Sequence, residues 1–196
     1  MTGSHPTDPL AAVAWPLRTE RLLVRRAEAA DADTTWGYRH LAEVARWVGV
    51  QPADRARWRD LLAERLHRTL VVELGGRVVG DLMVRIEDGW AQHECAGRAR
   101  GVQAELGWAL DPAFGGRGYA TEAVRELLRA CFEDLGLRRV TASAFAANEA
   151  SCRLMERVGM RCELRGVRDS LHRDLGWVDG VGYALLAEEW HGRQPA

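Results

Sequence analysis

The sequence contains no lysine, so arginine supplies all 27 of its basic side chains. These arginines are interspersed with 28 acidic residues, which leaves a formal net charge of −1. A chain with so little net charge produces no field strong enough to favour nucleic acid or an anionic membrane as a partner. We therefore expect neither partner.

Long apolar runs are also missing from the sequence. No stretch approaches the roughly 18 uninterrupted apolar residues of a membrane-spanning helix, and the first residues lack the basic start and apolar run of a signal peptide. The cysteines, Cys95, Cys131, Cys152 and Cys162, show no Cys-x-x-Cys spacing. This pattern favours a reducing, cytoplasmic compartment over a disulfide-stabilised secreted fold.

The histidines also lack the spacing of a metal-binding motif, and we predict no metal site.

The chain has 196 residues, of which 47% are hydrophobic, so it can bury a sizeable core as one domain. Its first residues are rich in Gly, Ser, Pro and Asp. We predict a mobile tail over residues 1–14 and a single domain over 15–196.

Hydrophobic periodicity predicts strands alternating with helices. Caps at Asp31 or Asp33, and a first turn at Pro52, predict helices over 31–47 and 52–67. Strands are predicted over 21–25, 70–74, 78–86, 104–110, 139–145 and 182–186, two further helices over 119–136 and 148–158, and loops over 88–101 and 169–177. This order predicts an α/β fold with helices on the faces of a mixed sheet.

The most informative motif is the glycine-rich run Gly115-Gly116-Arg117-Gly118-Tyr119-Ala120, which a helical stretch follows at once. Glycine lets the backbone approach a ligand closely, and a helix N-terminus offers unpaired N–H groups to an anion. Such a site binds phosphate without lysine. By itself the loop fits a tight turn equally well, because it lacks the Gly-Lys-Ser/Thr of a P-loop and matches the dinucleotide fingerprint poorly.

The surrounding sequence resembles the GNAT acetyltransferase superfamily over residues 104–160. The loop is similar to that family's Gln/Arg-x-x-Gly-x-Gly/Ala pattern, although Gly115 replaces the first residue. The segment from Asn148 to Gly159 is similar to its Asn-x-x-Ser/Ala-x-x-Leu-x-x-x-Gly-Phe pattern, with Met160 in place of Phe. Residues 18–22 resemble the family's opening strand, and residues 176–179 and 183–190 resemble the closing segment of its RimJ/RimL-like branch. The resemblance implies a mostly antiparallel sheet with a splayed parallel pair and flanking helices.

The resemblance also implies acetyl-CoA, or another short acyl-CoA, as the co-substrate of an N-acetyltransferase. The pyrophosphate is expected on the amides of the glycine-rich loop, and the pantetheine arm between the strands over 104–110 and 139–145. The residues expected to bind acyl-CoA are Trp108, Ala109, Leu110, Gly115, Gly116, Arg117, Gly118, Tyr119, Ala120, Thr121, Asn148 and Ser151.

Two side chains are candidates for proton transfer by this resemblance. Glu105 is the candidate general base, acting directly or through a water; the alternative is a solvated strand carboxylate. Ser151 is the candidate donor to the departing sulfur, because Met155 stands where many relatives have tyrosine; the alternative is a serine that caps or packs in the first helical turn. Cys152 lies about 100° away around the helix, so a structural thiol is favoured over an acyl-cysteine.

The acceptor is open at this stage. A protein N-terminus, as in ribosomal proteins, and a small-molecule amine or antibiotic are both consistent with the family, and a non-catalytic CoA-binding module is a further alternative. The loops over 31–50 and 88–101 are not rich in carboxylates, which weighs against an aminoglycoside. Dimers are common in this family, so a homodimer is an expected assembly. The residues expected near the acceptor are Trp36, Tyr38, Trp90, His172 and Trp177.

Overall fold

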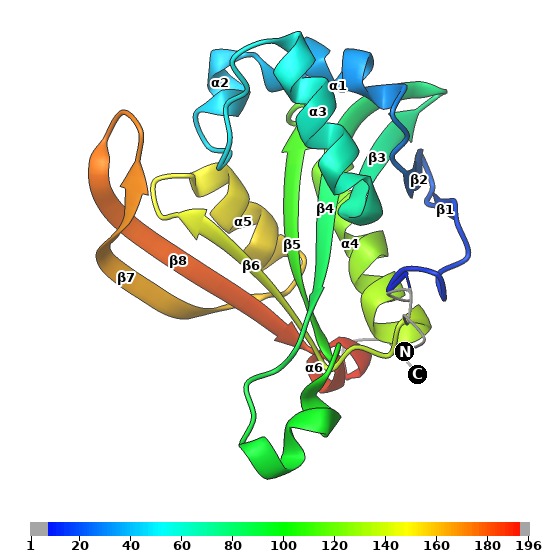
Figure 1. Cartoon of the computed structure of the whole chain (residues 1–196), viewed down its shortest axis with the longest axis vertical. Coiled ribbons are helices and arrows are strands. Elements are labelled where there is room, and N and C mark those ends of the chain that lie inside the picture. The colour runs from blue at the N-terminus through cyan, green and yellow to red at the C-terminus, as the bar shows by residue number, and fades with distance from the viewer. Residues whose placement is uncertain (1–7, 193–196) are drawn as a thin grey trace, which may run out of the picture.

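The computed structural model describes residues 8–192, and within them one mixed sheet runs through the whole fold (Figure 1). Its strands lie in the order β1-β2-β3-β4-β5-β6-β8-β7. The strands are β1 (Leu17–Arg18), β2 (Leu22–Arg26), β3 (Thr69–Leu74), β4 (Arg77–Glu87), β5 (Gln103–Leu110), β6 (Arg139–Phe145), β7 (Arg161–His172) and β8 (Gly176–Leu186). The predicted mixed sheet with flanking helices is confirmed.

Helices cover both faces of this sheet. The α-helices are α1 (Asp31–Arg39), α2 (Ala42–Ala45), α3 (Arg55–Arg65), α4 (Tyr119–Arg129), α5 (Glu149–Arg157) and α6 (Ala187–His191). Short helical turns are η1 (Leu66–Arg68), η2 (His93–Ala99), η3 (Pro112–Phe114) and η4 (Ala130–Asp134). None of the described helices combines the length and the apolar composition that a membrane crossing requires.

The strands are antiparallel to their neighbours except for β5 and β6, which are parallel. This pair is joined only from Gln103↔Arg139 to Glu105↔Thr141 among the described residues. Beyond that point the two strands diverge, as Figure 1 shows at the centre of the molecule. The predicted splayed parallel pair is therefore present, and it leaves the β6-facing edge of residues 106–110 without a strand partner.

Alternating side chains divide the core between the two faces of the sheet. Leu70, Leu82 and Leu106 belong to a large buried cluster that includes α4 and α5. Val71, the next residue along β3, belongs instead to a second cluster with Trp58 and Leu62 of α3. Because successive side chains of a strand point to opposite faces of the sheet, one set packs under α4 and α5 and the other under α1–α3.

The prediction of a mobile tail over residues 1–14 is wrong for its second half. Residues 1–7 lie outside the described residues, but Leu10 and Val13 are buried in the main core. The indole N–H of Trp15 donates to the Leu10 carbonyl at 3.2 Å, which fixes this segment against the sheet. Burial of Leu10 and Val13 is enough to pack this segment, although the polar residues around it led to the prediction of mobility.

Two element predictions also need correction. The helix predicted over 31–47 is broken, because Leu41 adopts an extended backbone conformation and packs with Tyr38 and Val44 in a small cluster of its own. The loop predicted over 169–177 is instead the tip of the β7–β8 hairpin. β7 is an edge strand with nearly all of its side chains exposed, so its sequence carries no alternation of apolar and polar residues.

Candidate functional site

A cavity of about 790 Å³ lies along the line where β5 and β6 separate. One end is formed by the glycine-rich loop and the start of α4, and the middle by β5, β6 and the first turns of α5. The other end lies under α2, α3 and η1. The cavity therefore joins the predicted phosphate loop to the helices on the opposite face of the sheet.

The loop that leads into α4 has a backbone geometry suited to an anion. The Asp111 carboxylate accepts from the Ala113 N–H at 3.0 Å and starts the turn η3. Gly118 is the residue before α4 and has a φ of +81°, a conformation that residues with a side chain rarely adopt. The first N–H groups of α4 lack helical partners, and Tyr119, Ala120 and Thr121 line the cavity.

Contacts from the N-terminal segment hold this loop in place. The Arg21 guanidinium donates to the Arg117 carbonyl at 3.1 Å and lies over the ring of Tyr119, 4.6 Å from its centre. Glu122, in the first turn of α4, accepts from the Arg21 N–H at 3.0 Å and from Thr19. The start of α4 is thus tied to the edge of the sheet by one carboxylate.

Ser151 lies in the middle of the cavity at the first turn of α5. Its hydroxyl oxygen accepts from the side-chain amide of Asn148 at 3.0 Å and from the indole N–H of Trp108 at 3.3 Å. Asn148 is the N-cap of α5, and its amide oxygen accepts from the Ser151 N–H at 3.3 Å. Since a hydroxyl oxygen accepts two hydrogen bonds and donates one, these contacts leave the Ser151 proton free for a ligand in the cavity.

The residues expected to bind acyl-CoA come together in this cavity with one exception. All of them except Arg117 line it. The Arg117 guanidinium lies beside the ring of Phe114, 6.0 Å from its centre, so this residue contributes its carbonyl to Arg21 rather than a side chain to the cavity. The residues are consistent with a bound acyl-CoA, because the loop is glycine-rich and the adjoining strand edge is unpaired.

Glu105, the candidate base, occupies the last paired position of β5 with β6. Its carboxylate forms an ion pair with Arg85, which itself lines the cavity, while Glu105 does not. Glu105 lies on the same face of β5 as Ala109, and Ala109 packs against Tyr38 under α1 and α2. The carboxylate therefore belongs to the face of the sheet under α1–α3.

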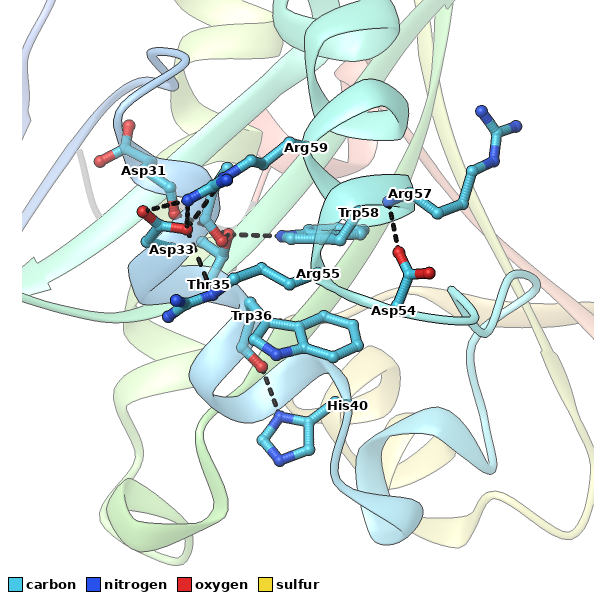
Figure 2. Close-up of polar contacts among 11 residues, drawn as sticks. Asp31, Asp33, Thr35, Trp36, His40, Asp54, Arg55, Arg57, Trp58 and Arg59 are labelled. Carbon is cyan, nitrogen blue, oxygen red and sulfur yellow. Dashed lines mark hydrogen bonds and ion pairs between the residues drawn. The ribbon is translucent and has the colours of Figure 1, made fainter.

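The five residues expected near the acceptor do not line the cavity. Trp36 stacks on His40, and its carbonyl contacts the His40 ring nitrogen at 2.6 Å (Figure 2). Trp90 is 94% exposed beyond the far end of β4. Trp177 is exposed on the β7–β8 hairpin. Position along the sequence did not indicate where these aromatic side chains point.

Tyr38 and His172 are buried and have structural partners. The Tyr38 hydroxyl donates to Asp81 at 2.7 Å, and burial raises the pKa of this tyrosine well above its ordinary value. The His172 ring contacts the Arg46 carbonyl at 2.8 Å and the rings of Trp47 and Phe145. Both residues therefore position α1 and α2 over the sheet.

Sequence reasoning missed the charged residues at the end of the cavity under α2 and α3. Arg39, Arg65, Arg68 and Arg85 line that end, together with Glu43 and Asp81. Asp81 is buried and forms an ion pair with Arg39. The arginines were hidden among many others, because the sequence gives no sign of which side chains face inward.

Cysteine chemistry is not favoured at the site. Cys152 does not line the cavity, and burial is the main cause that raises the pKa of its thiol. Burial also raises the pKa of Cys131 to about 12. Both thiols therefore stay protonated at neutral pH. Within residues 8–192, no group of His, Cys, Asp and Glu side chains is arranged to hold a metal ion.

Comparison with known proteins gives one family. The sequence model of the family described as acetyltransferase (GNAT) domain matches residues 21–161. The uncharacterized N-acetyltransferase YnaD of Bacillus subtilis (strain 168) is 34% identical over 87 residues, which is 44% of this chain and 51% of that protein. The matched part of the chain thus spans about half the length of this relative.

Solved structures share the fold over nearly the whole chain. An acetyltransferase of the GNAT family from Bacillus anthracis has a TM-score of 0.76 at 26% identity, covering 89% of this chain and 99% of that one. The ribosomal-protein-S5-alanine acetyltransferase from Vibrio fischeri has a TM-score of 0.72 at 19% identity, covering 93% of this chain and 100% of that one. At this identity the second likeness concerns the fold alone.

Proposed function

Because this chain belongs to the GNAT acetyltransferase family, we propose that it transfers an acetyl group from acetyl-CoA to a primary amine. One observation carries the proposal: a single cavity joins the glycine-rich loop, the separated edges of β5 and β6, and the Ser151 hydroxyl. This cavity would thus hold the pyrophosphate, the extended pantetheine arm and the reacting thioester one after another.

On the donor side, the backbone does most of the binding. Gly118, Tyr119 and Ala120 line the cavity, and their N–H groups would bind the pyrophosphate at the positive end of α4. The unpaired edge of residues 106–110 would accept the pantetheine arm as an additional strand. Another short acyl-CoA would use the same contacts.

In the transfer itself, the amine nitrogen attacks the thioester carbonyl carbon, and the bond between that carbon and sulfur breaks. Glu105 would take the proton that the amine loses, directly or through a water. Ser151 would donate to the departing thiolate the proton that the hydrogen bonds from Asn148 and Trp108 leave free. Water would then return a proton to the Ser151 oxygen and accept the proton held by Glu105. The cavity would hold the two reactants in contact, which removes most of the entropic cost of the reaction.

A protein N-terminus is the acceptor that we favour, with a small-molecule amine as the second candidate. Exposed residues, Glu43, Gly49 and Val50, line the mouth of the cavity beside α2. Such an open mouth admits the end of an extended peptide as well as a small molecule. The homodimer and the cytoplasmic location stay predictions.

Thiol release from acetyl-CoA tests the proposal. We would measure it with N-terminal peptides, amino acids, polyamines and aminoglycosides, and measure acetyl-CoA binding separately by calorimetry. Thiol release that depends on an amine supports the enzyme. Tight binding of acetyl-CoA with no release on any acceptor would overturn it in favour of a CoA-binding module.

A further inference from the structure

We infer that the acceptor carries a side-chain carboxylate in addition to its amine, and that Arg65 and Arg68 bind this carboxylate at the end of the cavity under α3 and η1. This inference rests on the proposed acetyl transfer and specifies its substrate class. Arg65 is in the last turn of α3 and Arg68 ends η1, so the two side chains lie on consecutive turns. Both line the cavity.

The first argument is that these two arginines lack anionic partners. Arg39 is neutralised by Asp81, and Arg85 by Glu87 and Glu105. Within residues 8–192, no ion pair or side-chain hydrogen bond engages the guanidinium of Arg65 or Arg68. This end of the cavity therefore has two arginines without an ion-pair partner among the described residues, and Glu43 is the one carboxylate lining it outside an ion pair.

The second argument is the burial of Arg68. Its Nε–H is buried and has no hydrogen-bond partner among the described residues. A buried donor without a partner destabilises the folded state, more so when the group is charged, and such groups are therefore rare in folded proteins. A carboxylate in the cavity would accept from this N–H and remove that destabilisation on binding.

The surroundings of Arg65 agree. Burial, and then the neighbouring charge of Arg68, lower the pKa of Arg65, whereas Glu64 is the acidic residue that opposes this shift. Arg65 also benefits from its place at the helix C-terminus, which explains its presence there. The helix dipole does not explain the unpartnered Nε–H of Arg68, which lies beyond the end of α3.

The register of the sheet gives the distance between the two ends of the acceptor. Thr69 pairs with Met83 across β3 and β4, and Met83 pairs with Gly107 across β4 and β5. Gly107 lies just past the point where β5 leaves β6. Two strand spacings, about 10 Å, separate the backbone of Thr69, the residue after Arg68, from that of Gly107. An acceptor whose amine lies where β5 leaves β6 would therefore have its carboxylate within about 10 Å of that amine. A dicarboxylic amino acid, or a peptide with an acidic residue near its N-terminus, fits this limit.

Paired acceptors distinguish these sources and test the inference. We would compare glutamate with glutamine, and a peptide beginning Ser-Glu with one beginning Ser-Gln, with spermidine as the cationic acceptor. The acidic member of at least one pair is expected to have a kcat/KM about tenfold higher or more. If only the acidic peptide is preferred over its neutral partner, the acceptor is a protein N-terminus. If only glutamate is preferred over glutamine, the acceptor is a small molecule. Equal rates within both pairs, or faster reaction with spermidine, would overturn the inference while leaving the acetyl transfer in place.

Variants locate the carboxylate. Arg68→Gln should raise the KM of the acidic acceptor about tenfold or more, without changing the KM of its neutral partner or of acetyl-CoA. Arg68→Lys should restore part of the preference, because it keeps the charge but not the planar group. Arg57→Gln, on the same helix but outside the cavity lining, is the matched control and should change neither KM. Equal losses for acidic and neutral acceptors would mean that Arg68 has only a structural role.

An equilibrium measurement separates this inference from the enzyme itself. Glutarate, a dicarboxylate without an amine, should raise the Tm of the wild type and of Arg57→Gln but not that of Arg68→Gln. This result requires no turnover. Stabilisation by glutarate that survives the loss of Arg68 would overturn the assignment, and so would its absence in the wild type, even if thiol release from acetyl-CoA is found.

Discussion

The indole N–H of Trp108 on β5 donates to the Ser151 hydroxyl oxygen on α5 at 3.3 Å, across the gap that separates β5 from β6. Together with the amide of Asn148, it occupies the accepting capacity of that oxygen. The serine proton is thereby the one part of the group still available. Asn148, and not Ser151, is the N-cap of α5, and this geometry supports the proton-donor role that we propose for Ser151.

We expect Ser151→Ala to lower kcat by about 10²-fold with little change in the KM of acetyl-CoA, since the donor to the departing thiolate is lost. Steady-state kinetics would check this. Ser143→Ala is the matched control, because Ser143 also lines the cavity but lies on β6. If Ser151→Ala and Ser143→Ala have the same kcat as the wild type, Ser151 is not the donor.

Asn148→Asp tests the direction of the serine proton more finely. The carboxylate can still accept the Ser151 N–H, so the cap of α5 and the Tm should be kept. It would also accept the Ser151 hydroxyl proton and withdraw it from the cavity. We therefore expect a fall in kcat at an unchanged Tm, and an unchanged kcat would contradict the proposed orientation.

Glu105→Gln should lower kcat by roughly 10²-fold or more if Glu105 is the base, while acetyl-CoA affinity stays the same. Glu43→Gln is the informative comparison, because Glu43 is a carboxylate that lines the mouth of the cavity whereas Glu105 is paired with Arg85. Rate measurements on both variants decide between them. A normal rate for Glu105→Gln with a large loss for Glu43→Gln would transfer the role to Glu43.

Sequence was enough to predict which residues line the glycine-rich-loop end of the cavity, because that end depends on backbone conformation. Glycine at position 118, the cap at Asn148 and the strand before Pro112 each determine a local conformation, and local conformation can be predicted from sequence. The position of Ser151 followed from the same helix start. Nearly all of the residues expected to bind acyl-CoA accordingly line one cavity.

The acceptor half depends on which side chains tertiary packing turns inward. Tyr38 was expected in the pocket, but its hydroxyl is bound to buried Asp81, and Trp58 of α3 takes its place in the cavity wall. The Trp58 indole N–H donates to Thr35 of α1 at 2.9 Å, which fixes its direction (Figure 2). Contacts between α1 and α3 of this kind leave no signal in either segment alone.

Glu122 provides a pH-dependent prediction for the loop. Partial burial acts to raise the pKa of its carboxyl, but hydrogen bonds from Thr19 and Arg21 outweigh burial and hold the pKa below its ordinary value. A lowered folded-state pKa contributes stability above the unfolded value, and that stability is lost as the pH falls through the folded value. We therefore expect Glu122→Gln to lower the Tm by a few degrees at pH 7, with the difference disappearing in acid. Glu149→Gln, which removes an exposed pair with Arg153, should leave the Tm unchanged. A Tm difference for Glu122→Gln that is the same at pH 7 and pH 3 would contradict this assignment.

Gly118→Val should abolish acetyl-CoA binding, because a β-branched residue resists the φ of +81° on which the start of α4 depends. The chain offers a matched control in Gly76, which has the same φ of +81° in the β3–β4 turn and no neighbouring atom within 4 Å of an added Cβ. Both substitutions impose a similar backbone strain of about 1–3 kcal/mol, so both should lower the Tm. Only Gly118→Val should lose acetyl-CoA in calorimetry, since Gly76 lies outside the cavity lining. Equal affinity in the two variants would mean that the glycine-rich loop is a turn and not the phosphate site.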